Sequence, residues 1–471
     1  MKLTRPAIAA ATVAILAASA VPHVADQADA PGPVIQAADE KVLTSVKEVP
    51  EEAPAAEKAP EEEVGDGKVE GAAEPSISKK PAELPQGDSE PVTDENLPDP
   101  EPVPEAEPTD PPVRALNEAP KTYKGEPQRW YSLTKYGALP HGEALEVKSE
   151  SMERYIPIAF FRAHDANNNI VDNAPTIYLL NGAGGSEQNT DWVAQALPQM
   201  VETFRGQGVN VVVPMEGAFS YYVDWAAEPP VSPEESHFYK GKQMWSTFLA
   251  KELPQAIERY AKANDKRAVA GLSMAATSTL LLAEHNPGFY QAVGSYSGCA
   301  ATSTPLPNFF VGLTVNRGAS SMTPDHVFGP MGSDYNRYND ALVNAAQLKG
   351  TKVYLSTGTG LAAESDMAGT LAKRLKDTGQ YSDFEASSVG SAKAYTLQVE
   401  GGVIEAAMNA CTHDLIAKMQ GNGMKRATGE VIQSDEDFVA ELRNVGTHSW
   451  PVWKDDLKLS FDRVFKPALG L

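Results

Sequence analysis

The chain has little cysteine, few basic residues and no long apolar run after its first residues. Its 471 residues include two cysteines, whose spacing offers no metal cluster. Forty Lys and Arg stand against 63 Asp and Glu, a formal net charge of −23, so nucleic-acid binding is not expected. No later segment reaches the roughly 18 uninterrupted apolar residues of a membrane helix. A phosphate loop with its lysine and a dinucleotide fingerprint are also missing, and we expect no cofactor.

The first residues have the three parts of a secretory signal. A short basic start, Met1 to Arg5, precedes an apolar run over 7–20 that ends in small residues, and 28–30 offers a second cleavage site. Residues 1–30 are therefore predicted to be a signal peptide, with an uncleaved anchor as the alternative. Export predicts a secreted protein in an oxidising compartment, where Cys299 and Cys411 can form one disulfide. Two buried free thiols are the alternative.

Most of the acidity lies in residues 31–125. This stretch holds 23 Asp and Glu against nine Lys and Arg, and 17 of the 36 prolines. Such a composition cannot bury enough apolar surface to offset its conformational entropy. We expect a disordered, extended linker that serves as a spacer or as a solubilising tail. Residues 126–471 are patterned like one large ordered domain, which is the expected catalytic domain.

Strand-like and helix-like segments alternate through this domain. Two early segments, 145–149 and 155–161, predict antiparallel strands. Later strands are predicted at 176–182, 209–214, 267–271, 292–297, 351–356 and 438–445, and helices at 192–204, 244–263, 274–285 and 402–419. The alternation predicts an α/β protein with a mostly parallel central sheet flanked by helices. Residues 301–350, rich in Gly, Pro and Asn, are expected to form an insertion or lid.

A Gly-Leu-Ser-Met-Ala sequence at 271–275 lies between a predicted strand and a predicted helix. A sharp turn there exposes the serine oxygen above the sheet and directs backbone N–H groups at a substrate, which requires small neighbours. The pattern is typical of the nucleophile elbow of the α/β-hydrolase fold, with Ala275 in place of the usual final glycine. Ser273 is the predicted nucleophile, and the alternative is an ordinary serine at a helix N-cap.

A serine hydroxyl is a poor nucleophile until a base removes its proton. Among the eight histidines, His448 lies on a loop after the last predicted strand, where the order serine, acid, histidine places the base. The acid orients the imidazole, and any well-placed carboxylate can do so. From the residues alone four candidates stay open: Glu405, Glu400, Glu364 and Asp366.

Acyl transfer also needs donors for the oxyanion of the tetrahedral intermediate. The N–H of Met274, directly after the nucleophile, is one candidate by geometry. The glycine-rich turn at 181–185 can supply a second, the N–H of Ala183. The same glycines also fit a turn without a catalytic role.

Five short segments occur in an order known from one family. They are Tyr-Leu-Leu-Asn-Gly at 178–182, Phe-Ser-Tyr-Tyr-Val-Asp-Trp at 219–225, Trp-Ser-Thr-Phe-Leu at 245–249, Gly-Leu-Ser-Met at 271–274, and Gly-Thr-His-Ser-Trp at 446–450. From about Leu145 onward the chain resembles the secreted mycolyltransferases of the antigen 85 type, including their corynebacterial relatives. The linker lies outside this resemblance.

The resemblance implies an acyltransferase of the cell envelope. A mycoloyl group from trehalose monomycolate would be carried on Ser273 and passed to a second trehalose, giving trehalose dimycolate, or to cell-wall arabinogalactan. The acid would be Glu405, with Glu400 as the fallback. Substrate contacts would involve Asn181, Gly184, Asp224, Trp225 and Trp450.

The turn at 181–185 departs from the family. Asn181 and Gly184 stand where the family often has an Asp and an Arg that contact the sugar, so the acceptor could be another glycan, a protein serine or water. Two alternatives remain: a secreted carboxylesterase that hydrolyses an acyl ester, and a cell-wall binding protein without catalysis.

Overall fold

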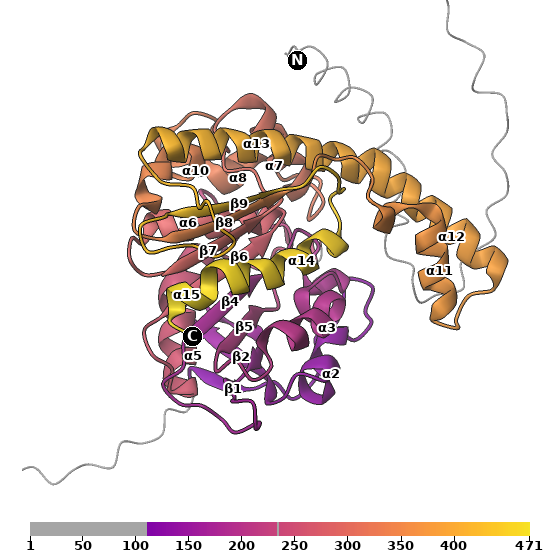
Figure 1. Cartoon of the computed structure of the whole chain (residues 1–471), viewed down its shortest axis with the longest axis horizontal. Helices are drawn as coiled ribbons and strands as arrows, with labels where there is room; N and C mark the ends of the chain where they lie inside the picture. The colour runs from indigo at the N-terminus through magenta and orange to yellow at the C-terminus, as the bar shows by residue number, and fades with distance from the viewer. Residues whose placement is uncertain (1–110, 233–234) are drawn as a thin grey trace, which may run out of the picture. The chain divides into compact units, whose positions relative to one another are not determined.

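The computed structural model describes residues 111–232 and 235–471. The predicted signal peptide and most of the predicted linker lie outside these residues. Within them, one sheet of nine strands has the order β1-β2-β3-β5-β4-β6-β7-β8-β9 (Figure 1). The strands are β1 (Val113–Ala115), β2 (Gly142–Ser149), β3 (Arg154–Phe161), β4 (Thr176–Leu180), β5 (Asn210–Pro214), β6 (Arg267–Leu272), β7 (Ala292–Tyr296), β8 (Lys352–Thr357) and β9 (Phe438–Leu442).

The direction of the strands follows the expectation from sequence. The pairs β1 with β2, β2 with β3, and β3 with β5 are antiparallel. From β5 to β9 every pair is parallel. This order, with β4 and β5 exchanged relative to the chain and antiparallel strands at one edge, is that of an α/β-hydrolase sheet. The predicted fold class is confirmed.

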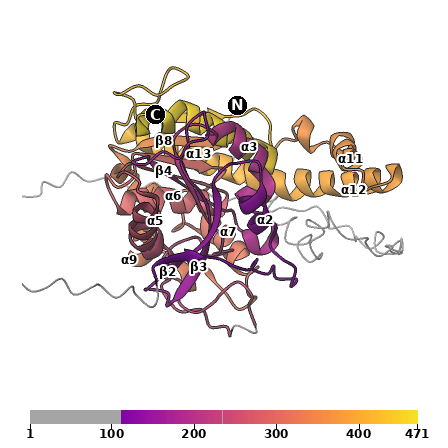
Figure 2. The ribbon, with the colours of Figure 1, turned by 90° about the horizontal axis from the view of Figure 1, so that it is seen from below.

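Helices cover both faces of the sheet (Figures 1 and 2). One face packs against α2 (Arg129–Tyr136), α3 (Trp192–Phe204), α14 (Trp450–Ser460), η6 (Phe461–Phe465) and α15 (Lys466–Leu469). The other packs against η2 (Phe248–Glu252), α5 (Leu253–Ala261), α6 (Met274–His285) and α13 (Gly402–Gly421). Because both faces are covered, β4, β5 and β7 are buried along their whole length.

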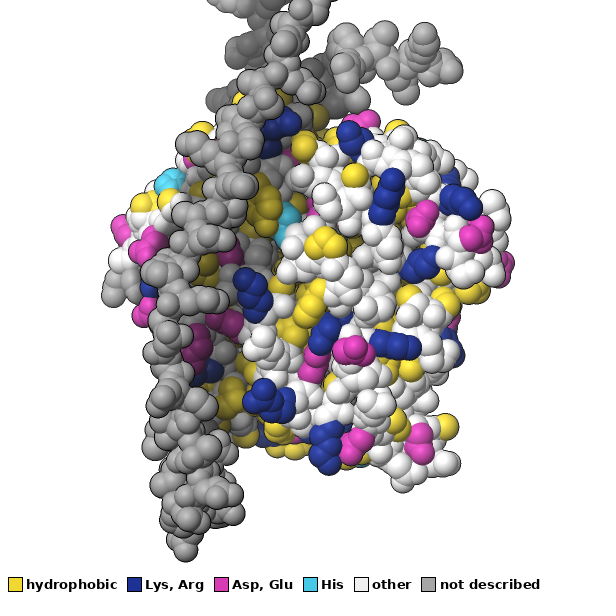
Figure 3. All heavy atoms as spheres, turned by 90° about the vertical axis from the view of Figure 1, so that its left-hand side faces the viewer, with side chains coloured by type: hydrophobic (Ala, Val, Ile, Leu, Met, Phe, Trp, Pro, Cys, Tyr) yellow, Lys and Arg dark blue, Asp and Glu magenta, His cyan; other side chains and the backbone are white. Residues whose placement is uncertain are grey.

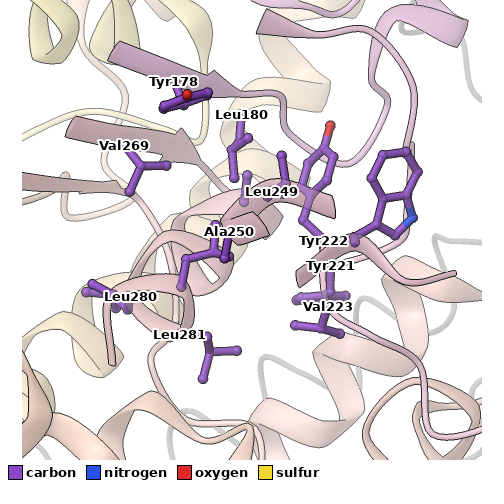
Figure 4. Packing of buried hydrophobic residues seen from close by; sticks show 14 of the residues in the cluster. Tyr178, Leu180, Tyr221, Tyr222, Val223, Leu249, Ala250, Val269, Leu280 and Leu281 are labelled. Carbon is purple, nitrogen blue, oxygen red and sulfur yellow. The ribbon is translucent and has the colours of Figure 1, made fainter. Parts of the chain in front are cut away.

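The second face shows how the predicted helices and strands meet. Tyr178 and Leu180 of β4 lie in one cluster with Leu280 and Leu281 of α6 (Figure 4). All four side chains are at most 1% exposed. The segment predicted as one helix over 244–263 is continuous but contains the π-helical turn η2 between α4 (Trp245–Thr247) and α5.

Short helices follow β7, as expected for the lid over 301–350. They are α7 (Pro305–Val315), α8 (Pro324–Phe328), α9 (Asp334–Tyr338), α10 (Ala341–Asn344) and η3 (Ala345–Leu348). A second addition was not expected from sequence. The helices α11 (Ala368–Asp377) and α12 (Asp383–Thr396) form a hairpin that projects from the sheet, and α12 continues through η5 (Leu397–Gly401) into α13 (Figures 1 and 2).

The structure has a strand before the domain boundary predicted at residue 126. Strand β1 lies inside the stretch assigned to the linker and pairs with β2, with Val113 opposite Val147. The guanidinium of Arg114 stacks on the ring of Tyr155 at 3.6 Å. A short strand of this kind is hidden by the average composition of the 95-residue stretch around it.

The described surface mixes both signs of charge. Acidic and basic side chains are interspersed on the face drawn in Figure 3. Among the described residues, no helix is long and apolar enough to cross a membrane. No group of His, Cys, Asp or Glu in the same residues could hold a metal ion.

Candidate active site

Ser273 occupies the turn between β6 and α6. Its backbone has φ 56° and ψ −121°, a conformation that residues other than glycine rarely adopt. Such strain persists when the surrounding structure holds the residue, and here Ser273 N–H donates to the carbonyl of Tyr296 at 2.8 Å. A Cβ at Gly271 would lie 2.7 Å from the carbonyl oxygen of Ala275, so the chain needs glycine there. The turn is therefore the sharp elbow that the sequence predicted.

His448 joins Ser273 to Glu405. Its Nε2 lies 2.8 Å from Ser273 Oγ, and its Nδ1 lies 2.8 Å from Glu405 Oε2. Because an ionised carboxylate only accepts hydrogen bonds, Nδ1 carries the proton and Nε2 is free to accept the proton of the serine hydroxyl. The side chain of His448 is 10% exposed and that of Glu405 is fully buried. The three groups thus form a chain in which a proton can leave the serine.

Both oxygens of the Glu405 carboxylate accept hydrogen bonds. Its Oε1 accepts from the hydroxyls of Ser297 at 2.8 Å and Thr357 at 3.1 Å. The same oxygen accepts from the N–H of Gly358 at 2.6 Å. Burial alone would raise the pKa of Glu405, but the hydrogen bond and charge of His448, together with these donors, hold the pKa below its ordinary value. The acid is therefore ionised in the folded protein.

The other carboxylates left open by the sequence do not reach His448. Asp366 is buried in its own turn, where it accepts from the N–H of Ala363 at 2.9 Å. Glu364 is exposed. Glu400 lies on η5, one turn before Glu405, and has no hydrogen bond to the imidazole. The structure thus brings Glu405 to His448.

Met274 and Ala183, whose N–H groups are the predicted oxyanion donors, line the same pocket as Ser273. Met274 begins α6, so its N–H is one of the donors that an α-helix leaves without an internal acceptor. Ala183 lies in the turn after β4, and its carbonyl accepts from Phe219 N–H at 2.8 Å. Both residues line the pocket that contains Ser273 and His448. Neither N–H has an acceptor among the described residues, which leaves both available to an oxyanion.

Cys299 and Cys411 form a disulfide that closes 112 residues of chain. The prediction of one disulfide, rather than two free thiols, is confirmed. Cys299 follows β7 and lines the pocket, whereas Cys411 lies in α13 together with Glu405. The bond therefore fixes the helix that carries the acid to the wall of the pocket.

The pocket above Ser273 has mostly apolar walls. Helix α7 provides one wall, with Pro307, Phe310, Val311, Leu313 and Thr314, and α13 provides Ile404 and Met408. Tyr221, Thr277 and Thr302 complete most of the remainder. The segment expected to be a lid thus forms part of the site. Its apolar lining suits the hydrocarbon portion of an acyl ester.

The five residues expected to contact a substrate lie outside this lining. Asn181 is fully buried, donates to the carbonyl of Pro214 and accepts from the N–H of Trp192. Asp224 accepts from the N–H and hydroxyl of Thr247.

Trp225 is buried and donates to the carbonyl of Ser220. Trp450 packs edge-on against Trp192, and Gly184 lies against Thr190. Each of the five has contacts inside the domain. Their contact with a substrate therefore stays a prediction.

Sequence reasoning missed the donors around Glu405 and one charged residue of the pocket. Ser297 directly follows β7 and Thr357 ends β8, so both lie at the carboxyl edge of the sheet, where polar residues at strand ends could have been noticed. Arg317, two residues beyond α7, lines the pocket together with Ser273. Nothing in its local sequence marks it as part of a site.

The family comparison covers most of the described chain. A family model for esterases matches residues 149–461. The chain belongs to this esterase family. The match includes the elbow, the acid and the histidine loop described above.

Several curated relatives are antigen 85 proteins. The chain is 30% identical over 230 residues to the diacylglycerol acyltransferase/mycolyltransferase Ag85B of Mycobacterium leprae, covering 48% of this chain and 65% of the relative. It is 32% identical over 231 residues to the protein of the same description, Ag85A, of Mycobacterium tuberculosis, covering 48% and 63%. The alignments thus span less than two thirds of these relatives. The resemblance to antigen 85 proteins seen in the five short segments is confirmed.

A solved structure also aligns with most of the chain. The crystal structure of Mycobacterium tuberculosis MPT51 (FbpC1) is 20% identical, covers 70% of this chain and 98% of its own, and has a TM-score of 0.47.

Proposed function

We propose that this esterase-family chain is a serine acyltransferase of the cell envelope that moves a mycoloyl group from trehalose monomycolate. The acceptor is a second trehalose, giving trehalose dimycolate, or cell-wall arabinogalactan. The observation that carries the proposal is the hydrogen-bonded chain from Ser273 Oγ through His448 to Glu405. Relatives described as acyltransferases and mycolyltransferases support the choice of donor.

The first half of the reaction acylates the serine. Ser273 Oγ attacks the ester carbonyl carbon while His448 Nε2 takes the hydroxyl proton. The carbonyl oxygen becomes an oxyanion, which the N–H groups of Ala183 and Met274 stabilise. When the intermediate collapses, the bond between the acyl carbon and the sugar oxygen breaks, and the imidazolium returns its proton to the leaving sugar. The acyl group is then an ester of Ser273.

The second half repeats these steps with a new hydroxyl. His448 takes the proton of the acceptor hydroxyl, whose oxygen attacks the acyl carbon, and the bond to Ser273 Oγ breaks. Glu405 stays ionised throughout and stabilises the imidazolium through Nδ1. The apolar side chains of α7 and α13 hold the part of the acyl chain next to the ester and displace water from it. Transfer to a sugar rather than to water depends on this displacement.

The test is mass spectrometry of the intact protein after trehalose monomycolate is added, with and without trehalose. We expect an adduct of one mycoloyl group that disappears faster when trehalose is present, with trehalose dimycolate as the product. Ser273→Ala should form no adduct, whereas Ser391→Ala, on the exposed surface of α12, should behave like the parent. An adduct that decays at the same rate without trehalose would instead favour a carboxylesterase. An adduct that persists in Ser273→Ala would refute the serine mechanism.

Export is part of the same proposal. Residues 1–30 would be removed as a signal peptide, and the acidic stretch that precedes β1 would act as a spacer that lets the domain reach its substrates in the envelope, or as a solubilising tail. N-terminal sequencing of the protein from culture medium and from the cell envelope tests this. A protein found only in the cytoplasm with an intact N-terminus would contradict it.

A further inference from the structure

Two loops meet beside the catalytic pocket. One is the turn after β4, residues 181–188, which contains Ala183. The other follows β5 and covers residues 215–222, and we name it the 215–222 loop. The N–H of Phe219 donates to the carbonyl of Ala183 at 2.8 Å, which joins the two. Tyr221 and Ala183 both line the pocket, so the position of the 215–222 loop bears on both of these residues.

The backbone of the 215–222 loop needs support from its surroundings. Phe219, Tyr221 and Tyr222 have φ values of 61°, 57° and 47°, which residues other than glycine adopt uncommonly. Each is at most 6% exposed, and Figure 4 shows the two tyrosines in the packed core. Residues in such conformations persist only where the surrounding structure holds them. The loop should therefore relax if one of its supports is removed.

Glu187 provides such a support from the turn after β4. It lies in η1 (Ser186–Gln188) and is 2% exposed. Its Oε1 accepts from the N–H of Gly217 at 3.1 Å and from the N–H of Ala218 at 3.4 Å. The hydroxyl of Ser186 donates to the carbonyl of Met215 at 2.5 Å. Two neighbouring side chains of the turn thus hold the first half of the 215–222 loop, and its second half reaches the pocket.

The carboxylate of Glu187 satisfies two buried donors. Gly217 and Ala218 are both buried, and their N–H groups have no other acceptor among the described residues. A buried N–H without a partner is costly, so without the carboxylate the chain should shift until these groups find another acceptor. Phe219 is the next residue and would move with them. Its hydrogen bond would carry the shift to Ala183.

We propose that Glu187, together with Ser186, is a positioning residue for the acylation of Ser273. Holding the 215–222 loop against the turn places the N–H of Ala183 where it can donate to the oxyanion. Glu187 itself touches neither the substrate nor the reacting atoms. A donor to an oxyanion lowers the barrier only when it lies within hydrogen-bond distance of that oxygen, so a small displacement slows the reaction more than it weakens substrate binding. The inference rests on the serine chemistry of the proposed function.

The first test measures the burst of nitrophenol released from 4-nitrophenyl octanoate. Its rate constant reports acylation, and its amplitude counts the reactive serines. Glu187→Met keeps an unbranched side chain and removes both oxygens, and it should lower the rate constant by about tenfold to a hundredfold with the apparent affinity for the ester within about twofold. Glu187→Gln keeps an acceptor oxygen and should stay within about threefold of the parent. Glu284→Met, at a carboxyl of similar burial on α6, is the matched control and should acylate like the parent.

The second test uses an octyl trifluoromethyl ketone. Ser273 Oγ adds to its carbonyl carbon, the serine proton passes to His448, and the carbonyl oxygen becomes an oxyanion that mimics the tetrahedral intermediate. The inhibition constant of the ketone should rise in Glu187→Met by the same factor as the rate constant falls. Octanol has no carbonyl and should inhibit the parent and the variant equally.

The other outcomes overturn the proposal. A smaller burst with an unchanged rate constant would mean that Glu187 only supports folding, and equal weakening of ketone and octanol would mean that it only shapes the apolar pocket. Glu187→Gln as slow as Glu187→Met would rule out the acceptor role. If Glu187→Met gives no burst at all, Ser186→Ala decides in its place: a selective rise in the inhibition constant of the ketone is expected, and an unchanged constant refutes the proposal.

Failure of the proposed function gives a different result. A parent protein without any burst would refute the serine mechanism, and this inference with it. A parent that is acylated by the nitrophenyl ester but not by trehalose monomycolate would refute only the proposed donor, because the positioning of Ala183 concerns the acylation step for any ester.

Discussion

A buried carboxylate beside the turn that contains Ala183 should make the stability of the protein depend on pH. Glu187 lies in η1 (Ser186–Gln188), directly after the turn that contains Ala183, and is 2% exposed. Its Oε1 accepts from the N–H groups of Gly217 and Ala218 at 3.1 and 3.4 Å. Burial, helped by the charge of Glu216 and opposed by Lys240, raises the pKa of Glu187 to about 7.

The size and sign of the effect follow from this pKa. In an unfolded chain the carboxyl has a pKa of 4.5, so between pH 4.5 and 7 the folded protein binds a proton that the unfolded chain has released. Stability therefore falls as pH rises through this window. Each pKa unit corresponds to about 1.4 kcal/mol, so ionised Glu187 lowers the free energy of unfolding by about 3 kcal/mol above pH 7 relative to acid pH.

Glu187→Gln removes the ionisation and keeps an oxygen that can accept from Gly217 and Ala218. We expect the variant to gain about 3 kcal/mol relative to the parent between pH 5 and pH 8, measured by urea unfolding at intervals of one pH unit. Other buried carboxyls with raised pKa values, such as Asp191 and Glu284, contribute equally to both proteins. Glu202→Gln, exposed on α3, controls for loss of a charge. Parallel pH profiles for the parent and Glu187→Gln would refute the reasoning.

Two further predictions concern the site. Glu405→Gln should lower kcat/KM by about a thousandfold without unfolding the protein, because His448 loses the negative charge that stabilises the imidazolium. Because the pKa of Glu405 is below its ordinary value, Glu405 should become protonated, and the enzyme lose activity for that reason, only below about pH 4.5. Ester hydrolysis rates across pH measure both effects, and a loss under tenfold would contradict the assignment. Replacing Cys299 and Cys411 by alanine should lower the free energy of unfolding by about 4–5 kcal/mol, because the disulfide closes 112 residues of chain. Urea unfolding measures this, and a stability equal to the parent's would disprove it.

The core of the fold could be predicted because its strands and helices have clear local patterns. The strand β4 is largely apolar and is followed by a glycine-rich turn, and α6 follows the elbow serine directly. The hairpin of α11 and α12 could not be predicted in the same way. Both helices are largely polar and pack mainly on each other, and few of their side chains are buried, so no run of core-facing apolar residues marks them. The strand β1 is held by its pairing with β2, which depends on a partner 30 residues away.

The site was predictable where position along the chain determines position in space. The elbow and the loop after β9 place Ser273 and His448 at the same edge of the sheet, and the 2.8 Å contact between them follows. The acid could not be chosen from chain position alone. Glu400 and Glu405 lie in one helical segment, and only the rotation of that helix decides which of them points to the histidine. For Trp225 the sequence leaves the direction of the side chain open. A motif marks its loop, but its side chain packs inward on Tyr239.

The backbone conformation of Ser273 limits which residue types can serve as the nucleophile at this position. A threonine would offer the same hydroxyl and differs from serine by one methyl group. At a φ of 56°, however, a β-branched side chain crowds its own backbone, a cost that serine and cysteine largely escape. The backbone at position 273 can therefore accept cysteine but not threonine, although threonine is chemically closer to serine.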